Sequence, residues 1–260
     1  MEAVLSLLRE KYSSERDIAP KLRPADILLV HTKNSLWSKL IRTATHCYWN
    51  HALLVYSAAD LECGKDSPLV VDAKTNGIVA LGKAGYYLDN PAKFDVAVKR
   101  FERDWFQAGI GHDLCISGRV CNLAANEAEF KLGSRAGDAA DQLLRQATLI
   151  LRFVRRKLFG SRPPPRLPWN LRLSEFKAFT CGGFVQWCYY RAVSRAIDDT
   201  GMENTRLREV LFNSRISGDV TPFGLLTTTP ADLANCQKLT WKYILKDGRL
   251  SDYSQQAAAT

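Results

Sequence analysis

Apolar residues recur along this chain with two spacings, and the change of spacing separates predicted strands from predicted helices. Short apolar runs, several with alternating polar residues, predict strands, whereas apolar residues three or four positions apart predict amphipathic helices. Strands are predicted in RPADILLVHT, HALLVYSA, PLVVDAKT, IVALG, FDVAVKRF and KLTWKYILKDGRLS. Helices are predicted in about the first 17 residues, NSLWSKLIRTAT, GDAADQLLRQATLILRFVRRKLFG, the run after Cys181, and TPADLANC.

The order of these elements predicts an α+β domain. Asn76-Gly77 separates two of the strands and predicts a tight hairpin. No regular pattern predicts an element between about 102 and 133. The expected organisation is a helical extension at 1–23, a domain at 24–250 with a partly helical insertion at 102–168, and a loose tail at 251–260.

The predicted helix at Cys181 begins with a thiol. Backbone N–H groups at a helix start are unpaired, and the positive end of the helix dipole there favours a thiolate. The same N–H groups can stabilise an oxyanion on a substrate, and Gly182 and Gly183 are expected to leave room for a substrate carbonyl. Alternatively, Cys181 is a small apolar residue that fills the core. One face of this helix is expected to carry Phe184, Val185, Cys188, Tyr189, Ala192 and Val193.

A cysteine nucleophile needs a base, and His51 is the candidate because it opens the apolar strand HALLVYS, where a sheet would fix its position. The alternative is a hydrogen-bonded histidine at the edge of the core. Of the other histidines, His46 falls in a helix-to-strand turn, and His31 and His112 have no comparable context.

Asp72 is the candidate for orienting the base. It is an acid within the apolar strand PLVVDAKT, where strand propensity disfavours it. A neighbouring antiparallel strand could bring Asp72 beside His51. The alternative is a solvated side chain on the outer face, because successive side chains alternate between faces.

Composition narrows the class of protein. Apolar residues make up 46% and charged residues 24% of the 260 residues, as expected for a globular protein. The seven cysteines form no CxxC pair, so neither a zinc site nor a disulfide framework is expected, and no cofactor is needed for thiol chemistry. The first residues do not resemble a secretory signal, so we expect a protein that is cytoplasmic or delivered by another route.

The net charge of +9 is unevenly distributed. Seven Lys and Arg residues and no acid occur from Arg145 to Arg166, so an amphipathic helix over Arg145–Lys157 could lie on an anionic membrane. The alternative is an ordinary helix packed on the core. Nucleic acid is a less favoured partner because no nucleic-acid-binding motif accompanies the charge.

Several segments, in order, resemble a known family. PADILL, SLWSKLIRTAT, YWNHALLVYS, VVDAKTNGIVA, FTCGGFVQWCYYRA and TPADLANC are similar to the YiiX-like branch of the permuted NlpC/P60, papain-like superfamily, over about residues 24 to 245. The resemblance implies a circularly permuted papain-like fold, with an antiparallel sheet packed against the cysteine-bearing helix. It assigns Cys181 as nucleophile, His51 as base and Asp72 as the third polar residue.

The chain departs from the family at three positions that adjoin these motifs. Ala25 stands where the family commonly has Gly, Asn50 where it often has Ser, and Gly182 where it often has Ser. The implied activity is that of a cysteine hydrolase or acyltransferase that forms a thioester, first of all on an amide bond of peptide or peptidoglycan type. The alternatives are a lipid or acyl-protein esterase, thioesterase or acyltransferase at a membrane, and a binding module without activity on the same fold.

Overall fold

The fold is built on one seven-stranded antiparallel sheet. The computed structural model describes residues 18–58, 67–73, 79–107, 115–132 and 179–253. The strands are ordered β4-β3-β2-β1-β5-β6-β7, and neighbouring strands are antiparallel. Their bounds are β1 Ile27–Thr32, β2 His51–Ser57, β3 Leu69–Ala73, β4 Val79–Lys83, β5 Phe94–Phe101, β6 Leu239–Lys246 and β7 Arg249–Asp252.

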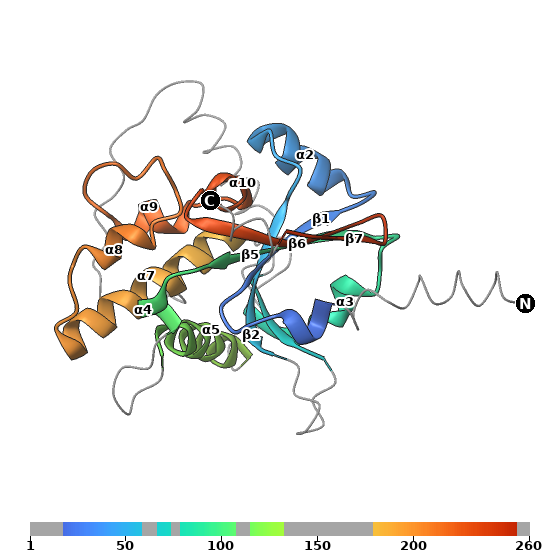
Figure 1. Cartoon of the computed structure of the whole chain (residues 1–260). Helices are drawn as coiled ribbons and strands as arrows, with labels where there is room; N and C mark the ends of the chain where they lie inside the picture. Colours follow the sequence, from blue (N-terminus) through green and yellow to red (C-terminus); the bar gives the residue numbers. More distant parts are fainter. Residues whose placement is uncertain (1–17, 59–66, 74–78, 108–114, 133–178, 254–260) are drawn as a thin grey trace, which may run out of the picture.

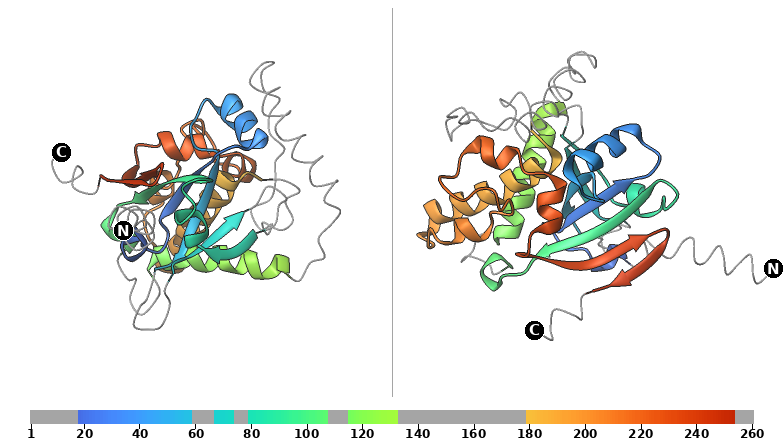
Figure 2. Two further views of the ribbon diagram at one scale, coloured as in Figure 1. Left: turned by 90° about the vertical axis from the view of Figure 1, so that its right-hand side faces the viewer. Right: turned by 90° about the horizontal axis from the view of Figure 1, so that it is seen from above.

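Helices cover the sheet unequally (Figure 1). Helices α5 and α7 lie together on one face, whereas the short elements η1 and α3 pack on the other. Figure 2 shows α2 apart from this helical layer. The bounds are η1 Ala19–Lys21, α2 Leu36–Thr45, α3 Gly85–Leu88, α4 Asp104–Gln107, α5 Ile116–Leu132, α7 Cys181–Thr200, α8 Arg206–Glu209, α9 Pro222–Leu226 and α10 Pro230–Asn235.

Alternation along the strands divides the core into two clusters. On β1, Ile27 and Leu29 belong to the larger cluster with α5 and α7, whereas Leu28 and Val30 belong to the smaller one. All eight residues of β5 are buried, because helices or further strands cover both of its faces. The α+β class predicted from the sequence is confirmed.

Most of the predicted elements are present. The helix after Cys181 begins at that residue, and all six apolar positions expected on its inner face are fully buried. The antiparallel pairing of β3 and β4 agrees with the predicted hairpin, although residues 74–78 lie outside the described ranges. The predicted helices in the first 17 residues and at 145–157, and the tail from 254, also lie outside them.

The region without a predicted element contains a long helix. In α5, Ile116, Val120, Cys121 and Ala124 are buried and recur at helical spacing. This pattern was present in the sequence but weak, because two of the four side chains are small. Ile18 and Leu22, in the expected N-terminal extension, are buried in the core, and β7 continues to Asp252.

One helix has the opposite burial from that expected. In α2, Leu36 and Leu40 are 80% and 55% exposed, although apolar residues four positions apart on a helix normally face the core. Ser38, a polar residue of the same helix, is buried and donates a hydrogen bond to the Thr32 carbonyl at 2.8 Å. No helix in the described ranges is long and apolar enough to cross a membrane.

Candidate active site

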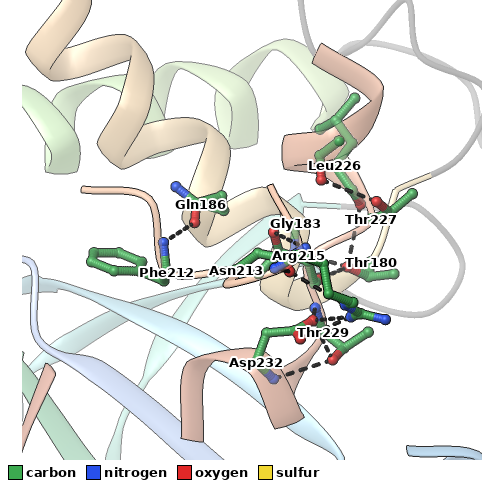
Figure 3. Close-up of polar contacts among 12 residues, drawn as sticks. Thr180, Gly183, Gln186, Phe212, Asn213, Arg215, Leu226, Thr227, Thr229 and Asp232 are labelled. Carbon is green, nitrogen blue, oxygen red and sulfur yellow. Dashed lines mark hydrogen bonds and ion pairs between the residues drawn. The ribbon is translucent and has the colours of Figure 1, made fainter. Parts of the chain in front are cut away.

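The first turn of α7 is fixed by hydrogen bonds to a neighbouring segment. Thr180 is the N-cap, and its hydroxyl accepts the Gly183 N–H at 2.8 Å. The Thr180 N–H donates to the Leu226 carbonyl at 3.2 Å, and its hydroxyl also hydrogen-bonds to the Thr228 carbonyl. Figure 3 shows this segment running alongside the start of α7. The position of Cys181 is therefore set by backbone contacts on both sides of the cap.

The two glycines after Cys181 have a different role from the one predicted. A Cβ added at Gly183 would lie 2.0 Å from the Leu226 carbonyl oxygen, and one at Gly182 would lie 2.7 Å from the Thr229 carbonyl carbon. The space expected to admit a substrate carbonyl is filled by the protein's own backbone. The expectation was wrong because the spacing of residues along one chain does not reveal which distant segment packs there.

A second segment holds α7 one turn further along. The Gln186 side chain is buried, donates to the Val210 carbonyl at 2.7 Å and accepts the Phe212 N–H at 2.7 Å. Beyond it, the Arg215 guanidinium binds both carboxylate oxygens of Asp232, at 2.6 and 2.8 Å (Figure 3). These contacts join the helix start to the loop after α8 and to α10.

His51 and Asp72 are brought together by the register of two strands. Asp72 on β3 lies opposite Leu53 on β2, so His51, two residues before Leu53, is its diagonal neighbour on the same face. The His51 Nε2 and the Asp72 Oδ1 are 2.7 Å apart. Both side chains are largely shielded, with 15% and 8% exposed. Asp72 is therefore not the solvated residue of the alternative interpretation.

The Cys181 thiol lies close enough to the imidazole of His51 to interact with it electrostatically. Because Asp72 occupies Nε2, the ring nitrogen left for the thiol is Nδ1. Burial alone lowers the pKa of His51, but the charge of Cys181 and the hydrogen bond to Asp72 outweigh it and raise that pKa to about 10. The structure thus brings together the three site residues predicted from the sequence, with an imidazole that favours its charged form.

Tyr87 is a fourth member of the site that the sequence did not indicate. Its hydroxyl donates to the Asp72 Oδ2 at 2.7 Å, so the carboxylate is bound by His51 on one oxygen and by Tyr87 on the other. Burial and the negative charge of Asp72 raise the pKa of Tyr87 well above its usual range, so it remains a donor. No local motif marks Tyr87, because α3 reaches Asp72 only through the fold.

The other described histidines and cysteines have different surroundings. The His31 Nδ1 lies 3.0 Å from the Tyr48 carbonyl, and His46 ends α2 in an exposed left-handed conformation. Cys121 and Cys188 are buried, and burial raises the pKa of both thiols, that of Cys121 to about 12. Burial of Cys188 follows the sequence prediction. His112 and Cys63 lie outside the described residues.

A cavity of about 530 Å3 opens beside His51 and Asp72. Its walls come from β1, α2, the first residues of β2, β4 and α3, and Tyr87 is part of the lining. Leu81 and Tyr86 line it as well and are 45% and 60% exposed. A substrate in this cavity would lie against the imidazole, with apolar side chains beside it. Within the described residues, no three His, Cys, Asp or Glu side chains cluster as metal ligands would.

Comparisons with known proteins do not assign a family. Neither a scan against models of protein families nor a search of curated proteins found a match to this chain.

Proposed function

We propose that this protein is a cysteine-dependent hydrolase or acyltransferase that forms a thioester on Cys181. The observation that carries the proposal is that His51 is hydrogen-bonded to Asp72 and lies beside Cys181, with the cysteine at the N-terminus of a 20-residue helix. A nucleophile, a base and a residue that orients the base are the parts that acyl transfer requires.

Each group has a defined step. The Cys181 thiolate attacks the carbonyl carbon of the substrate, and backbone N–H groups at the start of α7 stabilise the oxyanion. The His51 imidazolium protonates the leaving group, which gives a thioester on Cys181. Water, or another acceptor, then attacks the thioester as His51 takes its proton, and the thiolate is released. Asp72, held by Tyr87, keeps the imidazole in position throughout.

The resemblance to the permuted NlpC/P60 superfamily supports the same chemistry. The histidine strand precedes the cysteine helix in the chain, as in the YiiX-like branch. Ala25 adopts a φ of 68°, a conformation that favours glycine, which is the residue the family commonly has there. Asn50 accepts the Thr32 N–H at 2.7 Å and so ties the start of β2 to β1. Gly182 has no room for the serine that the family often has. The order of strand and helix and the conformation of Ala25 favour a permuted papain-like fold, whereas the packing at Gly182 is a departure from the family.

The bond cleaved is proposed to be an amide, as the resemblance implies. A second candidate is an ester or thioester with an apolar acyl group, which is favoured by the exposed Leu81 and Tyr86 beside the cavity. Intact-mass analysis after incubation with amide, thioester and ester probes of matched acyl chain length would distinguish the two candidates.

The same measurement tests whether the site is catalytic at all. A single probe adduct is expected in the native protein and none in Cys181→Ala. Cys115→Ser and Cys236→Ser are the matched controls, because these two thiols are also half-buried and should leave labelling unchanged. Labelling spread over several cysteines, or unchanged in Cys181→Ala, would instead indicate a binding module without activity.

Substitution of the residues that contact the far side of the imidazole should lower the rate while the protein still folds. Asp72→Asn should retain the fold and lower turnover, because a neutral amide cannot stabilise the imidazolium. Tyr87→Phe removes one hydrogen bond to Asp72 and should lower turnover less. If Asp72→Asn turns over at the native rate, Asp72 has no role in orienting His51.

A further inference from the structure

In the part of the chain that the structure describes, most of the exposed large apolar side chains stand on elements that wall one cavity. Five large apolar side chains are exposed within the described residues, and four of them stand on the elements that wall the cavity beside His51. Leu36 and Leu40 lie on α2, on one side. Leu81 and Tyr86 lie on β4 and α3, on the other. We call these four residues the apolar rim.

The polarity of α2 is reversed with respect to the rest of the fold. Its leucines face water while Ser38 is buried, whereas a helix of a globular protein normally buries its apolar side. Ser35, Ser38 and Ile41 line the cavity, whereas Leu36 and Leu40 are not part of its lining. An apolar side left in water next to a binding cavity is typical of a surface that contacts a partner or a membrane.

The charged residues within the two wall segments are all basic. Residues 31–46 and 79–88, which include both walls, contain four Lys and Arg residues and no Asp or Glu. Lys33 is paired with Asp95 and Asp247, at 2.8 and 2.7 Å. Lys39 and Lys83 are exposed, and neither forms an ion pair within the described part of the chain. Exposed leucines beside unpaired cations match the apolar boundary and the phosphates of an anionic bilayer.

We propose that the apolar rim docks on the surface of an anionic phospholipid bilayer. Leu36 and Leu40 enter the boundary between headgroups and acyl chains, and Lys39 and Lys83 lie at the phosphates. The cavity mouth, between the two walls, then faces the membrane. This orientation brings a membrane-borne substrate to the cavity beside His51 and in that respect rests on the proposed function, whereas docking itself needs no chemistry.

A bilayer fits the rim better than an acidic protein does. The apolar residues stand on two walls with the cavity between them, so a partner that contacts both walls must bridge the opening. A fluid bilayer surface can do so without a complementary shape. A folded protein would cover the cavity and exclude substrate from His51.

Vesicle flotation tests the proposal with the full chain. The native protein should float with vesicles of phosphatidylcholine and phosphatidylserine, but not with phosphatidylcholine alone. Leu36→Ser with Leu40→Ser should reduce the partition coefficient about tenfold or more, because burial of each leucine contributes on that scale. Lys39→Glu with Lys83→Glu should reduce it about fivefold or more per site.

Matched controls isolate the rim. Arg195→Glu with Arg208→Glu makes the same change of charge on α7 and α8, which lie away from α2 in Figures 1 and 2, and should bind about as well as the native protein. Cys181→Ala should also bind normally, so a failure of the proposed chemistry would leave docking intact. Conversely, normal probe labelling in the leucine variant would show that its fold and site are intact.

Three outcomes would overturn the proposal. The first is no binding of the native protein to anionic vesicles. The second is binding that survives both rim variants but is lost when Arg152, Arg155, Arg156 and Lys157 are replaced by Gln, which would assign the contact to that basic segment. The third is capture by immobilised polyglutamate, with the same dependence on the rim but without vesicle binding, which would indicate an acidic protein partner.

Discussion

Helices α7 and α2 carry apolar residues at the same spacing, yet the fold uses them in opposite ways. Phe184, Val185 and Cys188 of α7 are fully buried against the sheet, α5 and α9. Leu36 and Leu40 of α2 are mostly exposed. Each helix also begins at a hydroxyl N-cap beside the site, Thr180 for α7 and Ser35 for α2. The difference shows that periodicity reveals which side of a helix is apolar, but not what covers that side.

The largest expected effect comes from truncating one apolar residue on each helix. Phe184→Ala should lower the free energy of unfolding by roughly 3–5 kcal/mol, because it leaves a cavity in a filled core. Leu40→Ala should change it by no more than about 0.5 kcal/mol, because the side chain is mostly in water already. Urea denaturation followed by circular dichroism measures both values. Equal losses would mean that α2 is packed as tightly as α7.

The next effect concerns the glycines that admit close packing. Gly183→Ala should cost about 1–3 kcal/mol or more, because its Cβ would overlap the Leu226 carbonyl. It should also slow probe labelling of Cys181, since the displaced segment positions that residue. Gly82→Ala, on the β4 wall, is the control: no atom lies within 4 Å of the added Cβ, so neither property should fall. Native stability in Gly183→Ala would contradict this packing.

The interaction of His51 with Asp72 should give a smaller change in folding stability, and this change depends on pH. The folded-state pKa of His51, about 10, lies above its ordinary value of 6.5, so its proton stabilises the folded state. That contribution is complete below about pH 6.5 and is lost as the pH rises to about 10. The free energy of unfolding of the native protein should therefore exceed that of Asp72→Asn by about 1.5–3 kcal/mol near pH 6. This difference should fall toward pH 10. A difference that grows with pH would contradict the assignment.

The smallest expected change in stability comes from removing the N-cap side chains of α7 and α2. Thr180→Ala should lower global stability by about 1 kcal/mol, because α7 belongs to the core. Ser35→Ala removes the bond that Ser35 accepts from the Ser38 N–H, but α2 is weakly covered, so its loss should stay local. Hydrogen exchange should then accelerate in the α2 amides alone. Global destabilisation by Ser35→Ala would show that α2 folds with the core.

The site was predictable where local signals agreed, and less so elsewhere. Cys181 could be identified because the apolar residues after it recur at helical spacing from that position. His51 was identified because it opens an apolar strand, and Asp72 because it is an acid in a strand where propensity disfavours it. Tyr87 was missed because its contact with Asp72 joins two segments 15 residues apart that carry no common motif. The role of Gly182 and Gly183 was misread because the segment that fills their space lies more than 40 residues further along the chain.

By itself, the sequence determined the local structure of the described chain: the α+β order of elements, the strands, the helix at Cys181 and its buried face. Those features follow from the spacing of apolar residues and from caps, which act within a few residues. The tertiary structure alone decided that His51 and Tyr87 both bind the carboxylate of Asp72 and that the leucines of α2 stay in water. Such contacts depend on strand register and on which distant segment covers a surface, and the period of one segment carries no information about its neighbours in space.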